Sequence, residues 1–442
     1  MTKESFMRHH RNLVIWLMLG VVQICFGADT LKTRPLMKDF MGLCVHTVQF
    51  KPELYKPICR NVRDYHALNW DLGDETDFWP IFPLARNKVD WQSMYGQWIE
   101  TGYEIDACIL FGSFAFDAWV DPAGDAETYG FAFSRFFGPS GRNLVKSIEI
   151  GNEPGEYKDA QYRIIFKNMA KGIRFGDPKM KIVTCATVAG ESHEYAKSLE
   201  SIKGLEELYD VINVHSYAQL ENWPTWKRSF PEDSSIPYLK NIQDVIVWRN
   251  QYAPGKEVWI TEFGWDCTTK PNQKDGTFKD WVGNTDAEQA RYLVRSWLVF
   301  SAMDLDRAYM YWFNDNDEAK LHAASGLTRN YQPKPSFWAT AHLQKTLGQY
   351  RFEKIIQQHN NAFIYSYVHG SDLTKHVYAA WRPVGTESKT DVTIHLGNGK
   401  IVAAEKMPYT PTEPTAPTYQ NTSDGTIKLQ CSETPVYLWI NE

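Results

Sequence analysis

The sequence predicts an α/β fold: a (β/α)8 TIM barrel followed by a small C-terminal antiparallel β domain. Up to Gly348, short apolar runs alternate with amphipathic helical patterns, which is typical of strands and helices that alternate around a parallel sheet. After Gly348 the helical periodicity ends and short β-rich segments follow one another. We therefore expect the barrel over 28–349 and a β-sandwich-like domain over 350–442.

Eight apolar runs are predicted as the barrel strands, because parallel strands covered on both faces are continuously apolar. The runs are 40–48, 61–70, 104–111, 146–151, 181–188, 211–217, 257–263 and 307–313. A doubly wound open sheet would give the same alternation and remains the alternative. Neither GxGxxG nor GxxxxGK[ST] occurs in the chain, so the sequence gives no support for nucleotide binding.

Three helices have clear boundaries in the sequence. The first covers 159–175 and ends at a Gly-Asp-Pro sequence. The second begins at a capping box formed by Thr285 and Glu288. The last covers 336–347 and lies between a proline and a glycine.

The C-terminal β domain is predicted from short, often alternating segments that show no helical period. These segments are 362–369, 376–382, 391–396, 426–431 and 435–440. The stretch 408–417 is rich in Pro and Thr and is expected to be an extended loop within the domain.

The first 27 residues resemble a secretory signal peptide. Lys3, Arg8 and Arg11 precede an apolar run over 13–26, which is the right length for a signal-peptide core and short for a membrane span. An uncleaved anchor is the alternative. With 1–27 removed, no apolar stretch long enough to cross a membrane remains. The sequence therefore predicts a secreted or periplasmic protein without a membrane span.

Charge and cysteine usage exclude several other classes. The formal net charge is −6 and no Lys/Arg-rich run occurs, so a nucleic-acid partner has no electrostatic support. Six cysteines remain after residue 27, and an even number permits disulfides without specifying their pairing. Cys44, Cys108 and Cys185 lie within strand-like runs, which favours buried free thiols. No Cys/His spacing typical of zinc is present, and we expect neither a metal nor a cofactor.

Two strand-like segments end in a carboxylate. Glu153 follows the expected fourth strand in the sequence SIEIGNEP, and Glu262 ends the seventh in VWITEFGW. The carboxyl ends of barrel strands converge on one mouth, where active sites lie. Glycosidic-bond cleavage needs one carboxylic acid to protonate the leaving oxygen and one carboxylate to attack the anomeric carbon or to activate water. The Asn152 amide could bind a sugar hydroxyl, and Trp265 flanks Glu262. Helix N-termini also accept acidic residues, so either Glu alone would be weak evidence.

These two motifs together resemble clan A glycoside hydrolases, the retaining (β/α)8 glycosidases. The resemblance implies that Glu153 is the acid/base and Glu262 the nucleophile. It also implies that His215 and Tyr217, in VINVHSY, contact the nucleophile or the sugar, and that Trp312 stacks under the sugar. The segment 61–66 resembles family 39 xylosidases and family 86 agarases and porphyranases.

Arg63 and His66 lie where the second strand should end, and each has two interpretations. They could contact the sugar, or they could form a structural ion pair. Trp70, Trp119, Trp223 and Trp226 lie in expected loops, where any of them could line a subsite.

The sequence thus predicts a secreted retaining glycoside hydrolase that cleaves β-glycosidic bonds of a carbohydrate substrate. A carbohydrate-binding barrel without catalysis is the alternative from another class. An aldolase-like or isomerase-like barrel would need a Schiff-base lysine or a metal cluster at the strand ends, and no strand clearly ends that way.

Overall fold

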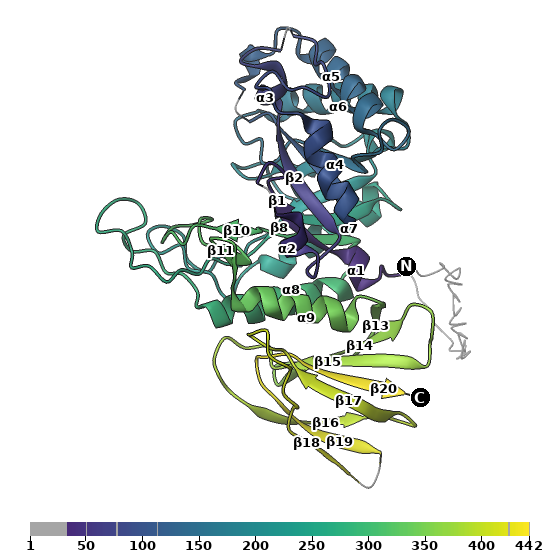
Figure 1. Ribbon diagram of the computed structural model, residues 1–442, viewed down its shortest axis with the longest axis vertical. Coiled ribbons are helices and arrows are strands. Elements are labelled where there is room, and N and C mark those ends of the chain that lie inside the picture. Colours follow the sequence, from purple (N-terminus) through teal and green to yellow (C-terminus); the bar gives the residue numbers. More distant parts are fainter. Residues whose placement is uncertain (1–32, 50, 77, 113, 423–424, 442) are drawn as a thin grey trace, which may run out of the picture. The chain divides into compact units, whose positions relative to one another are not determined.

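The computed structural model describes residues 33–49, 51–76, 78–112, 114–422 and 425–441. The predicted signal peptide, 1–27, lies outside these residues. Among the helices that are described, none is long and apolar enough to cross a membrane. Residues 34–442 form one compact unit, shown in Figure 1.

Eight parallel strands form a closed barrel, as the sequence predicts, and the open-sheet alternative is wrong. Their order around the sheet is β4-β3-β2-β1-β9-β8-β7-β5, and pairing of β4 with β5 closes the ring. The strands are β1 (Met41–Val45), β2 (Asn61–Ala67), β3 (Glu104–Leu110), β4 (Ser147–Ile150), β5 (Lys181–Val188), β7 (Val211–His215), β8 (Glu257–Phe263) and β9 (Arg307–Met310). Several end earlier than the apolar runs suggested, because the last residues of those runs already turn into the loops at the mouth.

Helices surround this barrel unevenly. They are α1 (Met37–Phe40), α2 (Pro52–Tyr55), α3 (Leu68–Leu72), α4 (Trp91–Thr101), α5 (Pro122–Phe137), α6 (Asp159–Gly176), α7 (Tyr238–Tyr252), α8 (Asp286–Ala302) and α9 (Pro335–Leu347). The Thr285–Glu288 capping box at the start of α8 is confirmed. The regular alternation is broken between β5 and β7, where the described chain has only the short strand β6 (Lys197–Ser198) and the 3₁₀ turns η2 (Leu199–Ser201) and η3 (Glu206–Leu208).

Other short elements lie in the loops. They are η1 (Phe116–Ala118) after β3, and β10 (Asn314–Asp315), β11 (Thr328–Arg329) and β12 (Gln332–Pro333) between β9 and α9.

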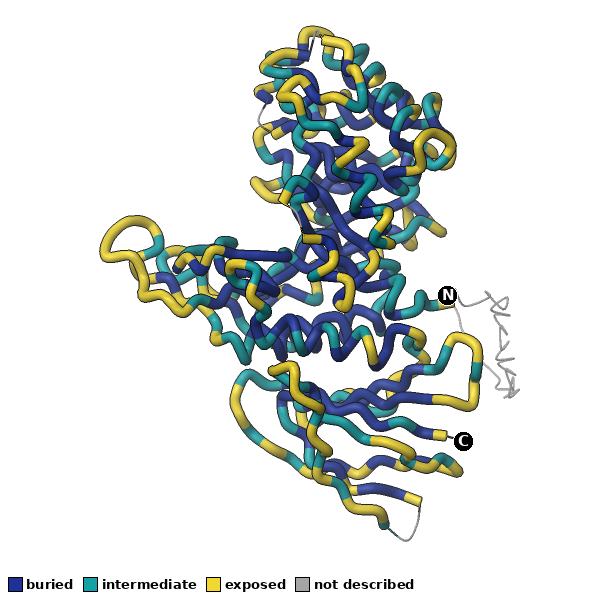
Figure 2. Tube along the Cα trace, in the orientation of Figure 1, coloured by how far each residue is buried: buried dark blue, intermediate teal, exposed yellow. Residues whose placement is uncertain are grey.

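The barrel interior is apolar at one level and polar at the next. Cys44, Val183, Val211, Trp259 and Tyr309 pack together in one buried cluster inside the ring. Because side chains alternate along a strand, every second residue points inward. On several strands the inward positions nearest the mouth carry polar side chains, and these build the site described below. Figure 2 shows long buried stretches along the barrel strands.

Two antiparallel sheets follow α9, as predicted. The first has the order β13-β14-β15-β20-β17 and the second β16-β19-β18. Apolar residues from both sheets, including Ile364, Ile394 and Ile427, form one buried core between them. The strands are β13 (Tyr350–His359), β14 (Ala362–His369), β15 (Lys375–Trp381), β16 (Thr390–His395), β17 (Lys400–Lys406), β18 (Tyr419–Asn421), β19 (Thr426–Cys431) and β20 (Val436–Asn441).

Polar contacts join these sheets to the barrel. Glu232, in the loop between β7 and α7, forms a buried ion pair with Arg295 of α8. The indole N–H of Trp381, on β15, donates to the same carboxylate at 2.6 Å. The β7–α7 loop is therefore held from outside by both α8 and the C-terminal sheets.

All six cysteines after residue 32 are buried free thiols in this structure. The interpretation of Cys44, Cys108 and Cys185 as buried thiols is confirmed. Burial raises the pKa of Cys44 to about 12, so this thiol stays protonated at neutral pH.

Candidate active site

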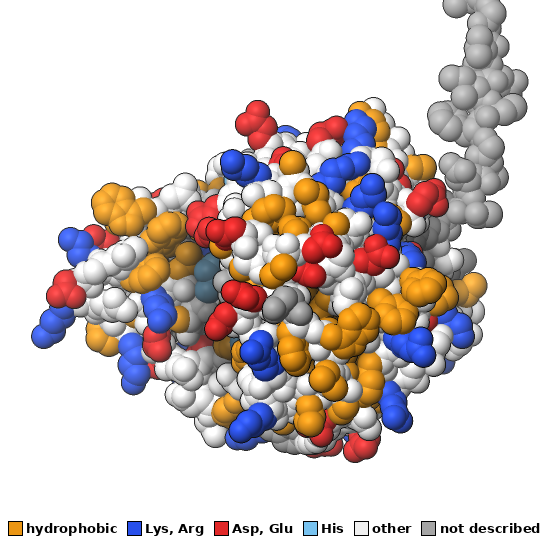
Figure 3. Space-filling view, turned by 90° about the horizontal axis from the view of Figure 1, so that it is seen from above, with side chains coloured by type: hydrophobic (Ala, Val, Ile, Leu, Met, Phe, Trp, Pro, Cys, Tyr) orange, Lys and Arg blue, Asp and Glu red, His pale blue; other side chains and the backbone are white. Residues whose placement is uncertain are grey.

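A cavity of 570 Å³ opens at the carboxyl ends of the barrel strands. Its lining combines aromatic, amide and imidazole side chains with two carboxylates. The cavity contains Glu153 and Glu262, together with Asn152, His215, Tyr217, Tyr65, Tyr311, Trp226, Arg228, His46, His193 and His322. Figure 3 shows a hollow in this face of the molecule, with a histidine side chain visible inside it.

Two glycines allow the chain to place the carboxylates there. Gly151 follows β4 with a φ of 91°, a left-handed conformation that favours glycine, and this turn carries Asn152 and Glu153 to the mouth. Gly264 follows Glu262, and a Cβ at this position would lie 2.4 Å from the Tyr311 carbonyl oxygen. Each motif therefore needs a glycine beside its carboxylate, Gly151 for its backbone conformation and Gly264 for close packing.

Arg63 is fully buried beneath the cavity and connects the strands around it. Its guanidinium donates to both oxygens of Glu149, at 2.8 and 2.7 Å. It also donates to Glu262 at 2.9 Å and to the Asn152 side-chain oxygen at 2.7 Å. Since Asn152 uses its oxygen for Arg63, its N–H groups are oriented for a ligand. Of the two interpretations that the sequence allowed for Arg63, the ion pair is the one formed.

Glu262 is surrounded by hydrogen-bond donors. Tyr65 donates to one carboxylate oxygen at 2.6 Å, and Tyr217 donates to the other at 2.8 Å. Burial alone would raise the pKa of Glu262, but the charges of His215 and Arg63 and the two tyrosine hydrogen bonds lower it to about 2. This carboxylate is ionised throughout the physiological range.

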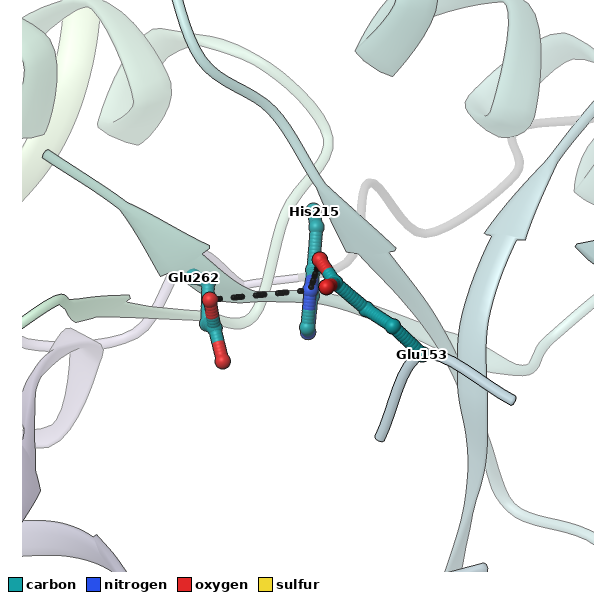
Figure 4. A group of neighbouring side chains, drawn as sticks. All are labelled: Glu153, His215 and Glu262. Atoms are coloured by element: carbon teal, nitrogen blue, oxygen red, sulfur yellow. Dashed lines mark hydrogen bonds and ion pairs between the residues drawn. The ribbon is translucent and has the colours of Figure 1, made fainter. Parts of the chain in front are cut away.

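Glu153 lies in the opposite electrostatic environment. Its Oε1 is 2.8 Å from Nδ1 of His215, and the same nitrogen is 3.8 Å from Glu262. Burial and the negative charge of Glu262 raise the pKa of Glu153 despite the hydrogen bond to His215. One atom from each of the three side chains lies within 4.8 Å of the others, and Figure 4 shows the imidazole between the two carboxylates.

This cluster is the only described group of three potential metal ligands so close together. The atoms that would bind a metal already have hydrogen-bond partners. Nδ1 of His215 faces Glu153, and the Glu262 oxygens accept from Arg63, Tyr65 and Tyr217. The neighbouring guanidinium would also repel a cation. The arrangement suits proton transfer better than metal binding.

Two of the predicted substrate contacts lie away from the cavity. His66 alternates with Arg63 and Tyr65 along β2, so its ring points outward, where it stacks on Trp91 at 4.0 Å between ring centroids. Both ring nitrogens are occupied, by Tyr95 and Asp71. The buried indole of Trp265 donates to the Ser229 carbonyl at 2.8 Å. Neither residue is kept among the proposed sugar contacts.

Trp312 is half-buried beside the cavity. Its ring stacks on Tyr311 at 5.4 Å and meets His46 edge-on at 5.0 Å between ring centroids. Tyr311 and His46 line the cavity directly. A contact between Trp312 and the sugar stays a prediction.

Several residues of the site were not found in the sequence. The two carboxylate motifs by themselves do not distinguish Glu149, Tyr65, Asn213 or Thr261. A usable pattern was present: Glu149 is buried in β4 two residues before the turn at Gly151, and Tyr65 is two residues after Arg63 on the same face of β2. A charged residue in an otherwise apolar strand needs a buried partner.

Replacing Arg63 by methionine tests this buried network. The substitution keeps much of the volume but leaves Glu149 buried without its cation, so the free energy of unfolding should fall by about 3–5 kcal/mol. Arg60→Met is the matched control, because the Arg60 side chain is 49% exposed immediately before the same strand. Its loss should stay below about 1 kcal/mol. Denaturant unfolding measures both, and equal losses would contradict the network.

Comparisons with known proteins identify relatives in fold. No protein-family model matches the chain, and no curated protein matches its sequence. A family 39 glycoside hydrolase from the gut symbiont Bacteroides cellulosilyticus WH2 superposes with a TM-score of 0.66 at 18% identity, over 92% of this chain and 81% of that one.

Two other solved glycoside hydrolase structures superpose on the chain to a similar extent. CelM2, a bifunctional glucanase-xylanase from a metagenome library, gives a TM-score of 0.61 at 14% identity, over 92% and 97% of the two chains. AbfB, a family 51 α-L-arabinofuranosidase from Bifidobacterium longum, gives 0.59 at 13% identity, over 93% and 97%. At these identities the comparisons show that the chain shares the barrel fold of these glycoside hydrolases.

Proposed function

We propose that this protein is a retaining glycoside hydrolase in which Glu262 is the nucleophile and Glu153 the acid/base. The observation that carries the proposal is the pair itself: two carboxylates with opposite pKa shifts, each with an atom inside one 4.8 Å cluster. Retaining enzymes place their carboxyl groups about 5–5.5 Å apart, whereas inverting enzymes need about 6.5–9.5 Å to admit a water. One oxygen of Glu153 and one of Glu262 lie within 4.8 Å of each other, closer than the carboxyl groups of an inverting pair, and this supports retention.

The reaction then has two steps. Ionised Glu262 attacks the anomeric carbon while Glu153 gives its proton to the glycosidic oxygen, which releases the first product and leaves a covalent glycosyl-enzyme. Glu153, now a carboxylate, takes a proton from water, and the resulting nucleophile releases the sugar from Glu262. Asn152 and Tyr217 line the same cavity and are proposed to contact the sugar there.

The substrate is proposed to be an oligosaccharide or polysaccharide with β-glycosidic bonds. The aromatic and amide lining of the cavity fits a sugar, whose faces are apolar and whose edge carries hydroxyls. The predicted signal peptide suggests a secreted or periplasmic enzyme.

A substrate screen tests the proposal. Wild type and Glu262→Gln are incubated side by side with β-glycans and nitrophenyl glycosides, and products are followed by reducing-sugar assay and thin-layer chromatography. Nitrophenyl α-L-arabinofuranoside belongs in the panel, because AbfB is named for that activity. Release by wild type alone supports the proposal, and the first product should keep the anomeric configuration of the substrate. Glycan-array binding without turnover would instead favour a binding barrel.

The pH profile follows from the two pKa shifts. Activity needs Glu262 ionised and Glu153 protonated. Because the pKa of Glu262 is about 2, the nucleophile is ready in mildly acidic solution. Because the pKa of Glu153 is raised, its proton is kept to higher pH than in an ordinary Glu and is lost as pH rises further. We expect kcat/KM to be flat in the mildly acidic range and to fall toward alkaline pH. A rate that rises into the alkaline range would contradict these roles.

A further inference from the structure

His215 bridges Glu153 and a chain of buried polar residues. On one side its Nδ1 faces Glu153 at 2.8 Å. On the other side its Nε2 lies 3.0 Å from the hydroxyl oxygen of Thr261. The Thr261 hydroxyl is 2.7 Å from the Asn213 side-chain oxygen, and the Asn213 amide nitrogen donates to Glu149 at 2.9 Å. Arg63 binds both oxygens of Glu149 from the far side.

The direction of every hydrogen bond in this chain is determined by its far end. Glu149, held by Arg63, accepts, so Asn213 must present its NH₂ group there and its carbonyl oxygen to Thr261. A carbonyl oxygen only accepts, so the single hydroxyl proton of Thr261 is used for Asn213. Toward His215 the Thr261 oxygen can then only accept. Nε2 of His215 must therefore carry a hydrogen.

This orientation determines what lies between His215 and Glu153. With the hydrogen on Nε2, a neutral imidazole has a lone pair at Nδ1. If Glu153 were ionised at the same time, a lone pair would face a carboxylate oxygen at 2.8 Å. The contact is favourable only when one proton lies between the two atoms, on either Glu153 or Nδ1.

We propose that Thr261 and Asn213 are positioning residues that keep one transferable proton between His215 and Glu153. The inference deepens the proposed function, since that proton is the one which Glu153 gives to the glycosidic oxygen and regains from water. Neither side chain lines the cavity, although Thr261 precedes Glu262 in β8; both act through His215. The raised pKa values of Glu153 and of His215 agree with a pair that resists losing this proton.

Replacing Thr261 by valine should weaken this hold. Without the hydroxyl, Nε2 no longer needs its hydrogen, and the neutral ring can carry the hydrogen on Nδ1 and donate it to ionised Glu153. The deprotonated pair becomes more stable, so it should lose its proton at a pH lower by about half to one unit, the equivalent of one neutral hydrogen bond. The other titratable groups facing His215 stay in place. They are Glu262 from β8, Arg63 from β2 and His322 from the loop between β10 and β11.

Two further variants separate positioning from packing. Thr261→Ser keeps the hydroxyl and should titrate like wild type. Asn213→Ala leaves Thr261 intact but removes the acceptor of its proton, so the hydroxyl can turn and donate to Nε2. This variant should show the same downward shift as Thr261→Val, and it replaces that variant if valine prevents folding.

The titration is read from the ring ¹⁵N shifts of His215 in the full chain, assigned with a His215→Gln variant. This measurement needs no substrate, so it can fail independently of the proposed function. The falling alkaline limb of kcat/KM should move in parallel once a substrate is known. A downward shift in Thr261→Val and Asn213→Ala, absent in Thr261→Ser, is the expected result. Unchanged or upward shifts in the valine and alanine variants would overturn the proposal.

Discussion

Glu262→Ala is expected to lose nearly all turnover, by at least about 10⁴-fold in kcat, as is typical when a catalytic nucleophile is removed. The expectation rests on the position of this carboxylate. It is held by Arg63, Tyr65 and Tyr217, which lower its pKa and aim it at the cavity, and no other described carboxylate lies in the lining beside Glu153. Steady-state hydrolysis of a nitrophenyl glycoside from the screen measures the loss.

Azide makes this test specific for the nucleophile. The small anion can enter the space left by the removed side chain and attack the anomeric carbon from the same face, displacing nitrophenolate. Some activity should return, and the glycosyl azide should have the anomeric configuration opposite to that of the substrate. Glu257→Ala, at the other end of the same strand, is the matched control and should keep most of the activity, since Glu257 pairs with Lys181 away from the cavity. Loss without azide rescue would leave the nucleophile role of Glu262 unsupported.

The barrel could be predicted because its signal is local and repeated. Most strands are continuous apolar runs, and all eight predicted runs correspond to strands of the ring. The end of a strand is harder to predict, because apolar residues such as Phe313 continue beyond the paired backbone into the loop that supports the mouth. The regular alternation also predicts a helix between β5 and β7, where the described chain has none. Leu199, Ile202 and Leu205 are buried there through short turns rather than through a helical face.

Only those site residues could be predicted whose type and position in the sequence indicate a chemical role. A carboxylate at the end of an apolar strand can be recognised in the sequence, and Glu153 and Glu262 are predicted in this way. Which way a neighbouring side chain points is set by strand register, and a one-residue error reverses it. In the sequence His66 and Arg63 are therefore equivalent candidates, but His66 faces outward and Arg63 faces into the barrel. Thr261 and Asn213 are ordinary strand residues in the sequence, and their hydrogen-bond partners come from other strands.

Glu153→Gln should separate the two roles of this residue. The amide cannot protonate a leaving group, so substrates with a poor leaving group, such as unmodified oligosaccharides, should lose about 10²–10⁴-fold in kcat/KM. Dinitrophenolate leaves without protonation, so with dinitrophenyl glycosides the rate of the first step, glycosylation of Glu262, should be nearly unchanged. The second step still lacks its base, so the glycosyl-enzyme should accumulate. Rapid mixing should show a burst of dinitrophenolate followed by slow turnover, with a lower KM than wild type.

The pH profile of the same variant provides an independent argument. If the alkaline limb of wild type reports the proton shared by Glu153 and His215, the limb should disappear from kcat/KM of Glu153→Gln on an unmodified oligosaccharide, because the variant has no such proton to give. Glu156→Gln, exposed three residues further along the chain, should keep both the limb and the rate. A limb that survives in Glu153→Gln would belong to another group. The acid/base would then have to be sought among the other titratable side chains of the lining, such as His322, whose ring packs edge-on against Tyr217 and Tyr311. His322 is a poor candidate on physical grounds, since burial and the charge of Arg228 lower its pKa to about 4 and leave it without a proton to give in the range where the enzyme should work.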